Sequence, residues 1–117
     1  MSVTVLAVGL PEEDERSLTK IAARDDLSLR KVKTMAEALT YMPVPVVVCE
    51  DTLPDGDWKA LLEESSHWRN PPRVIVTSPL ADEALWAEVL NLGGYDVLAE
   101  PLQSEEVRRV LNLASHS

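Results

Sequence analysis

Short apolar runs alternate along the chain with longer segments in which apolar residues recur every three or four positions. The runs are rich in β-branched residues, which favour strands, and the longer segments have the period of amphipathic helices. Strands are expected over residues 3–10, 27–32, 46–49, 73–77 and 95–99, and helices from near residues 12, 34, 58, 82 and 104. Five strand–helix pairs with short connections predict an α/β fold: a doubly wound, five-stranded parallel sheet with helices on both faces. We expect it to form one domain, residues 1–117.

Polar residues at the segment boundaries predict where the helices begin. Asp57 is placed to cap the third helix, and Ser104 is expected to cap the last one. The helix at 82–92 is expected to bury one side, which includes Leu92. Trp86 lies beside that side, so we expect it to be partly exposed.

Composition narrows the class of protein. The chain has 20 acidic and 11 basic residues and a net charge of −9, which repels phosphate backbones and argues against a nucleic-acid partner. Its one cysteine, Cys49, lies in an apolar run, which excludes a disulfide scaffold and a cysteine-based zinc site. The sequence contains no signal peptide and no apolar run of membrane length. We therefore expect a cytoplasmic protein that does not bind membranes.

The apolar run 46–49 leads directly into acidic residues and a turn. Glu50 and Asp51 follow the run, and residues 54–56 read Pro-Asp-Gly, which is typical of a turn. The carboxyl ends of parallel strands meet at one edge of such a sheet, where open α/β sheets place their sites. Candidate chemistry is therefore expected at Gly9-Leu10, Glu50-Asp51, Thr77-Ser78 and Glu100-Pro101.

Several motifs along the chain share the spacing of a known family. They are Glu50 followed by Leu53-Pro54 and Gly56, Thr77 at the end of the fourth strand, Gly93-Gly94-Tyr95-Asp96, and Glu100-Pro101. With these motifs the chain resembles the receiver domain of bacterial two-component response regulators over nearly its whole length. The resemblance implies the flavodoxin-like fold of that family.

Compared position by position, the resemblance implies that most functional groups of a receiver have been replaced. The phosphoacceptor aspartate falls on Glu50, with the neighbouring Asp51 as the alternative acceptor. The family's other functional groups fall on the following residues: the switch hydroxyl on Thr77, the switch aromatic on Val97, the lysine on Glu100, and the metal-binding acidic pair on Gly9 and Leu10. Of all these positions, only Thr77 carries the functional group that the family has there.

These replacements change the expected chemistry of the edge. Magnesium prefers several hard oxygen ligands, and Gly9 and Leu10 supply no side-chain oxygen. Glu100 reverses the charge of the family's lysine, which would stabilise a transferred phosphoryl group. Glu50 and Glu100 would disfavour each other's ionisation, so one should titrate high or point outward. We expect no bound metal, no cofactor, no catalytic residue and no ordinary phosphotransfer. The acids at 12–15 are read as charges suited to a helix start rather than as metal ligands.

These residues are compatible with three functions. The first is a stand-alone pseudo-receiver in phosphorelay-type signal transduction that works by protein–protein interaction without phosphorylation. It would bind a kinase, a regulator or itself as a homodimer through the face of the fourth helix, fifth strand and fifth helix. The second is a phosphoacceptor switch that uses Asp51 or Glu50 with a non-standard Mg²⁺ site. The third, a flavodoxin-like carrier, is disfavoured because the loop after the first strand has one glycine followed by the acids at 12–15.

Glu50 itself has two interpretations. It could imitate the phosphorylated state permanently, or it could be an acid kept at an unused, solvated strand end. We favour the second, because a carboxylate carries less charge than an acyl phosphate and half of the responding groups are missing.

Overall fold

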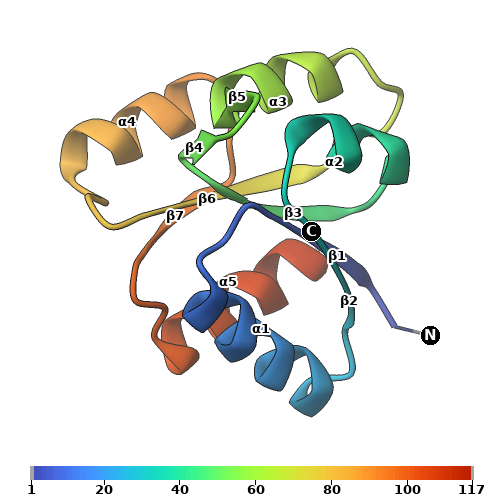
Figure 1. Ribbon diagram of the computed structural model, residues 1–117, viewed down its shortest axis with the longest axis vertical. Helices are drawn as coiled ribbons and strands as arrows, with labels where there is room; N and C mark the ends of the chain where they lie inside the picture. The colour runs from blue at the N-terminus through green and yellow to red at the C-terminus, as the bar shows by residue number, and fades with distance from the viewer. Residues whose placement is uncertain (1, 117) are drawn as a thin grey trace.

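The computed structural model describes residues 2–116 and shows a parallel sheet between two layers of helices (Figure 1). The sheet has five strands in the order β2-β1-β3-β6-β7, and every neighbouring pair is parallel. Their bounds are Thr4–Val8 (β1), Ser28–Val32 (β2), Val46–Glu50 (β3), Arg73–Ser78 (β6) and Asp96–Ala99 (β7). The predicted doubly wound α/β architecture is confirmed.

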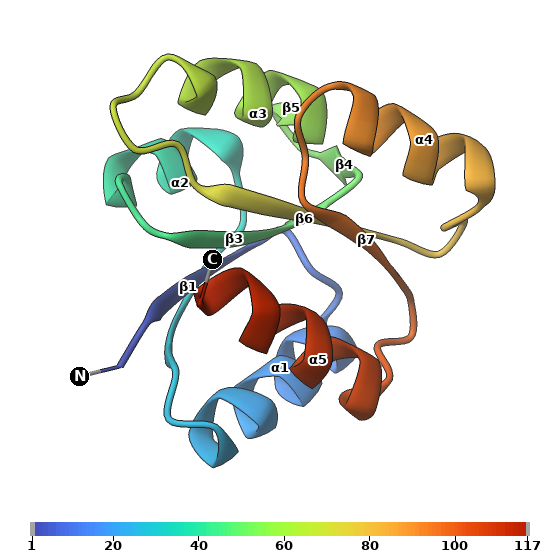
Figure 2. The same ribbon diagram turned by 180° about the vertical axis from the view of Figure 1, so that it is seen from behind.

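Five helices cover the two faces of the sheet. They are Glu12–Arg24 (α1), Met35–Tyr41 (α2), Trp58–Ser66 (α3), Glu83–Asn91 (α4) and Ser104–Ser115 (α5). Helices α1 and α5 lie on one face and α2, α3 and α4 on the other (Figures 1 and 2). Within residues 2–116, none of these helices combines the length and the apolar character that a membrane span needs.

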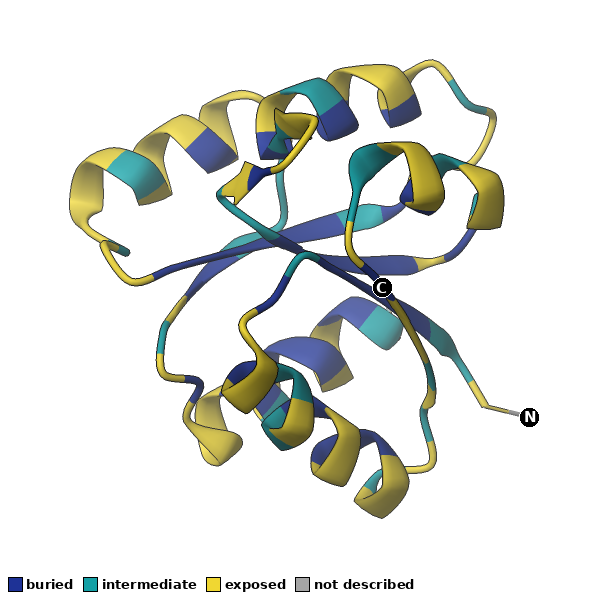
Figure 3. Cartoon of the chain, in the orientation of Figure 1, coloured by how far each residue is buried: buried dark blue, intermediate teal, exposed yellow. Residues whose placement is uncertain are grey.

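The central strands are apolar at successive positions because both of their faces are covered. In β3, Val46 and Val48 pack with α1 and α5, whereas Val47 and Cys49 pack in the cluster on the other face. Figure 3 shows this burial along the middle strands and on the inner sides of the helices. The edge strand β2 is largely exposed, because only one of its edges pairs with a neighbouring strand.

A small hairpin separates β3 from α3 and was not foreseen as strands. Its antiparallel strands are Thr52–Leu53 (β4) and Gly56–Asp57 (β5), and the predicted turn connects them. Asp55 fastens the hairpin to α2, because its carboxylate accepts the N–H groups of Met35 and Ala36 at 2.8 and 3.0 Å. Asp57 caps α3 as predicted, accepting the Ala60 N–H at 2.9 Å.

Two expectations about helix ends were wrong. Ser104 is the first residue of α5 and Gln103 is the capping residue, with no capping hydrogen bond from its side chain. Leu92 is 54% exposed, because α4 ends at Asn91 and Leu92 follows the last turn without continuing its buried side. The partial exposure expected for Trp86 is confirmed, at 51%.

Candidate functional site

The candidate residues converge at the carboxyl edge of the sheet, as the strand order requires. Glu50 ends β3 and lies opposite Thr77 of β6 in the strand register. Glu100 follows β7 directly, and its N–H donates to the Ser78 carbonyl at 3.0 Å. Parallel register between β3, β6 and β7 therefore brings together three side chains that lie up to 50 positions apart in the sequence.

Glu50 is held between two hydrogen-bonding partners. The hydroxyl of Thr77, a residue with no exposed surface, donates to Glu50 Oε2 at 2.9 Å. On its other side the Glu50 carboxyl group lies close enough to the Glu100 side chain for the two groups to shift each other's pKa. The Glu50 carboxyl group thus stands between the Thr77 hydroxyl of β6 and the carboxyl group that follows β7.

Two carboxyl groups this close disfavour joint ionisation, and the surroundings favour Glu100 as the protonated one. Burial raises the pKa of Glu100 to about 9, helped by its interaction with Glu50 and by the charges of Glu50, Asp14 and Asp51. Burial also raises the pKa of Glu50, but the interaction with Glu100 and the hydrogen bond from Thr77 oppose that rise. At neutral pH we therefore assign the proton to Glu100 and the negative charge to Glu50. This direction agrees with the expectation that one of the two acids titrates high, which stays a prediction.

One carboxyl oxygen of Glu100 is buried without a hydrogen-bond partner. This atom, Oε2, has none among the described residues. An unpartnered buried oxygen favours the neutral form of a carboxyl group, because a charged oxygen without a donor is much more costly. This geometry agrees with the direction of the Glu100 pKa.

Asp14 is a buried acid that the sequence analysis treated only as part of the acidic helix start. It is 4% exposed, and its Oδ1 accepts the Leu102 N–H at 2.9 Å. This bond ties the first turn of α1 to the segment between β7 and α5. No local signal separates Asp14 from the neighbouring acids, since its partner lies 88 positions away.

Asp51 takes part in a second acid–hydroxyl pair, one residue further along both strands. Its Oδ2 accepts the Ser78 hydroxyl at 2.7 Å, and the Ser78 oxygen accepts the Leu80 N–H at 3.0 Å. Ser78 was expected only to lie at this edge beside Thr77, with no partner assigned to it. Here Ser78, which is fully buried, and Asp51 together fix the start of the segment between β6 and α4.

The edge near Gly9 and Leu10 is apolar and closely filled. Gly9 has φ +70°, and a Cβ atom added there would lie 2.5 Å from Leu53 Cδ2. Leu10 is buried with 3% of its surface exposed. Within residues 2–116 no three His, Cys, Asp or Glu side chains are arranged to hold a metal ion. The residues at this edge therefore do not match the oxygen-rich ligand set that Mg²⁺ prefers.

Val97, which the resemblance matches to the switch aromatic, lies in β7 with 8% of its surface exposed. It packs in the core cluster that includes Val89 of α4. A short β-branched side chain has little rotamer freedom and cannot swing between a buried and an exposed position as a large ring can. The functional role of this position stays a prediction.

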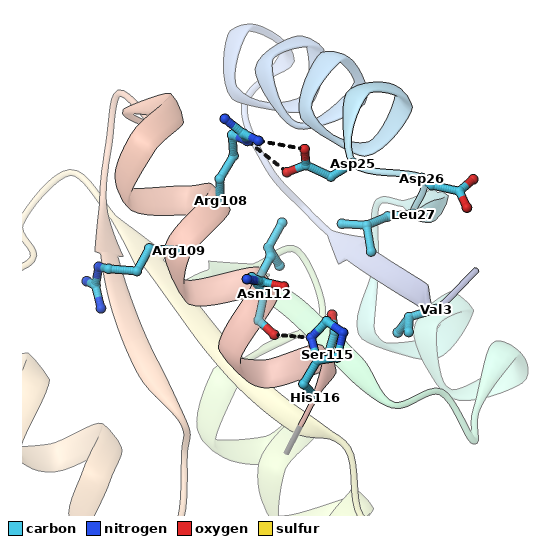
Figure 4. Close-up of a pocket in the computed structure, with 10 residues that line it drawn as sticks. Val3, Asp25, Asp26, Leu27, Arg108, Arg109, Asn112, Ser115 and His116 are labelled. Atoms are coloured by element: carbon cyan, nitrogen blue, oxygen red, sulfur yellow. Dashed lines mark hydrogen bonds and ion pairs between the residues drawn. The ribbon is translucent and has the colours of Figure 1, made fainter. Parts of the chain in front are cut away.

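A wide hollow of about 500 Å³ lies at the opposite, amino edge of the sheet, far from these acids (Figure 4). Asp25 after α1 and Arg108 of α5 form a two-pronged ion pair at 2.8 and 2.9 Å beside it. The guanidinium of Arg108 lowers the pKa of Asp25. Since the two charged groups satisfy each other, we regard the pair as a tie between the helices and not as a ligand site.

Comparisons with solved structures identify the fold. The chain is similar to the non-phosphorylated HemR receiver domain of Leptospira biflexa, with a TM-score of 0.85 and 19% identity over 99% of this chain and 96% of that one. A signal receiver domain from an HD domain-containing protein of Pseudomonas fluorescens gives a TM-score of 0.84 and 22% identity, over 98% and 88% of the two chains. A CheY-like receiver domain protein of Methanospirillum hungatei gives 0.80 and 17%, over 99% and 95%.

The protein therefore has the fold of response-regulator receiver domains, as the resemblance implied. No protein-family model matches the sequence, and a comparison with curated proteins finds no match. The similarity is thus one of backbone architecture, and the five positions that define a receiver's chemistry have to be judged from this chain's own residues.

Proposed function

We propose that this protein contains an atypical receiver domain that acts in bacterial signal transduction as a phosphorylation-independent interaction module. The proposal depends chiefly on the proton-sharing pair of Glu50 and Glu100. These residues stand at the positions of the phosphoacceptor and of the lysine. A carboxyl group beside the acceptor position supplies none of the positive charge with which a lysine would stabilise a transferred phosphoryl group.

The apolar filling near Gly9 supports the same proposal. Phosphotransfer in receivers, as the resemblance implies, depends on a divalent metal beside the acceptor. Leu53 occupies the space into which a side chain at position 9 would project, and Leu10 is buried. We propose that the protein uses no metal or other cofactor and has no enzymatic activity.

The partner would be another protein, a kinase or a regulator, bound at the face formed by α4, β7 and α5. Exposed apolar side chains on α4 support this choice, since Trp86 is 51% and Leu90 36% exposed. Half-exposed tryptophan is common in protein interfaces, where aromatic anchors contribute much of the affinity.

A phosphodonor experiment tests the proposal. The purified chain is incubated with acetyl phosphate and magnesium, and its intact mass is measured beside a phosphorylation-competent receiver domain treated in the same way. We expect no added phosphoryl group, and we expect a partner to bind equally well before and after the treatment.

Matched variants identify the acceptor if a phosphoryl group does appear. Label that disappears in Asp51→Asn, but persists in Glu50→Gln and in the exposed-surface control Glu63→Gln, would assign a working switch to the Asp51–Ser78 pair. Label that disappears only in Glu50→Gln would assign it to Glu50. Either result overturns the proposed function.

A further inference from the structure

A groove of about 230 Å³ runs along the face formed by α4, β7 and α5, and we call it the Trp86 groove. Figures 1 and 2 show β7 at the edge of the sheet with α4 on one face and α5 on the other. The groove is lined by Ala81, Asp82, Glu83, Trp86, Val97, Ala99 and Glu106. Its apolar part comes from small side chains of β7 beside the Trp86 ring, so it offers room for an incoming side chain.

The apolar part of the groove continues along α4. Trp86 and Leu90 lie one helical turn apart, on the same side of the helix, and both are exposed. Because the Trp86 ring is half exposed and lines the groove, part of its surface is free to pack against a partner. Contact with an apolar side chain would remove this surface from water.

All the charged residues that line the groove are acidic. Asp82 uses its carboxylate to cap α4, accepting the Leu85 N–H at 2.9 Å. Glu83 and Glu106 are exposed and form no ion pair with any residue between 2 and 116. Arg109, one turn further along α5, does not line the groove. The rim therefore presents uncompensated negative charge around an apolar centre.

This charge pattern disfavours a second copy of the chain as the occupant. In a two-fold symmetric dimer the same patch faces itself, so Glu83 and Glu106 of one copy would approach those of the other. Each copy also carries a net charge of −9, and like charges that face each other across an interface disfavour association. A positively charged partner gains from the same field.

We propose that the Trp86 groove receives one apolar side chain from a basic segment of a partner protein, with Lys or Arg residues of that segment beside Glu83 and Glu106. This inference rests on the proposed function and specifies the partner of the α4–β7–α5 face. It assigns affinity to the apolar contact at Trp86, and specificity and salt dependence to the two glutamates.

The test uses a library of short random peptides displayed on phage and selected on the whole chain. Selected peptides are expected to carry an apolar residue flanked by Lys or Arg. For the best of them, measured by anisotropy, we expect Trp86→Ala to raise the Kd about 30-fold. Glu83→Lys with Glu106→Lys should weaken binding on the order of tenfold or more at low salt and remove most of its salt dependence.

Two control variants make changes of the same kind on other surfaces of the protein. Tyr41→Ala removes a side chain that is 44% exposed on α2, and Glu63→Lys reverses an exposed charge on α3. Both should leave the Kd unchanged. Sizing across a wide concentration range accompanies the binding measurement and is expected to show no dimer that Trp86→Ala abolishes.

Three outcomes would overturn this inference. Selected peptides could lack basic residues, binding could be unaffected by Trp86→Ala, or a dimer could form through Trp86. None of them bears on phosphotransfer, which the phosphodonor experiment tests separately. A phosphoryl group found on the chain would overturn the proposed function even if basic peptides bound the groove.

Discussion

Glu50 and Glu100 place two carboxyl groups close together at the carboxyl edge of the sheet, where each shifts the pKa of the other. In a receiver domain the same two positions hold an aspartate and a lysine, as the resemblance implies, and their opposite charges attract. Here both groups are acids, so we expect a proton held by Glu100 to take the place of that attraction. The strength of the contact should then depend on pH.

The wild-type protein is expected to lose stability at alkaline pH, and replacement of Glu100 by glutamine is expected to remove that loss. Since the pKa of Glu100 is raised from 4.5 to about 9 in the folded protein, the native state holds more protons than the unfolded state between these values. The free energy of unfolding therefore falls as pH rises through this window. At pH 9 we expect Glu100→Gln to be more stable by about 1 kcal/mol, a value reduced for solvent screening of a partly exposed group.

Urea unfolding followed by tryptophan fluorescence between pH 5 and pH 9 would measure this difference, with Trp58, which is 3% exposed, as a buried reporter. Glu63→Gln is a suitable control because Glu63 is exposed on α3. Parallel pH profiles for wild type and Glu100→Gln would show that the pair does not share a proton.

Replacement of Glu100 by lysine separates the charge of the site from its metal chemistry. The ammonium group would form an ion pair with Glu50, lower the pKa of Glu50, and stabilise the fold at pH 8 by about 1 kcal/mol. We nevertheless expect no binding of magnesium with beryllofluoride, because Gly9 and Leu10 still supply no side-chain oxygen. A saturable change in tryptophan fluorescence on titration with both ions would contradict this expectation.

Asp14 can be tested by comparing two substitutions. Asp14→Ala leaves the buried Leu102 N–H without its acceptor and is expected to lower the free energy of unfolding by about 1–3 kcal/mol. Asp14→Asn keeps an acceptor oxygen while removing the charge, so it should cost much less. Because the charge of Asp14 helps to raise the pKa of Glu100, Asp14→Asn should also lower that pKa. Equal destabilisation by both variants would argue against the hydrogen bond as the cause.

The sequence predicted those parts of the fold and site that follow from periodicity and strand order. Glu50, Thr77 and Glu100 could be placed together because each lies at the carboxyl end of a buried strand, and parallel strands meet at that edge. Asp14 could not be placed, because its role depends on an N–H group 88 positions away.

The local errors have equally physical causes. Strands β4 and β5 have only two residues each, too few for any alternation of apolar and polar positions to be seen. Leu92 lies three positions after Val89, which would place it on the same side of a continuing helix. Because α4 ends at Asn91, Leu92 does not lie on that buried side. Periodicity indicates the type of an element more reliably than its ends.

Gly9 provides a test of why this edge lacks the acids of a receiver. Gly9→Ala and Gly93→Ala both place a side chain at positive φ, +70° and +99°, but only the first would bring a Cβ atom to 2.5 Å from a neighbour, Leu53 Cδ2. We expect Gly93→Ala to lower the free energy of unfolding by about 1 kcal/mol and Gly9→Ala by about 1–2 kcal/mol more, since overpacking adds to the backbone strain. Urea unfolding of the two variants would measure the difference.

A double-mutant cycle then isolates the contact between the two side chains. Leu53→Ala alone is expected to cost about 2–5 kcal/mol, because Leu53 is 95% buried in the core beside the hairpin (5% exposed). If Leu53 fills the space next to position 9, the double variant Leu53→Ala with Gly9→Ala should lose less free energy of unfolding than the two single variants together. The difference should be at least about 0.5 kcal/mol. Strict additivity would mean that Leu53 does not restrict position 9. The missing acid would then reflect backbone conformation alone, and the crevice would have room for a metal ligand after all.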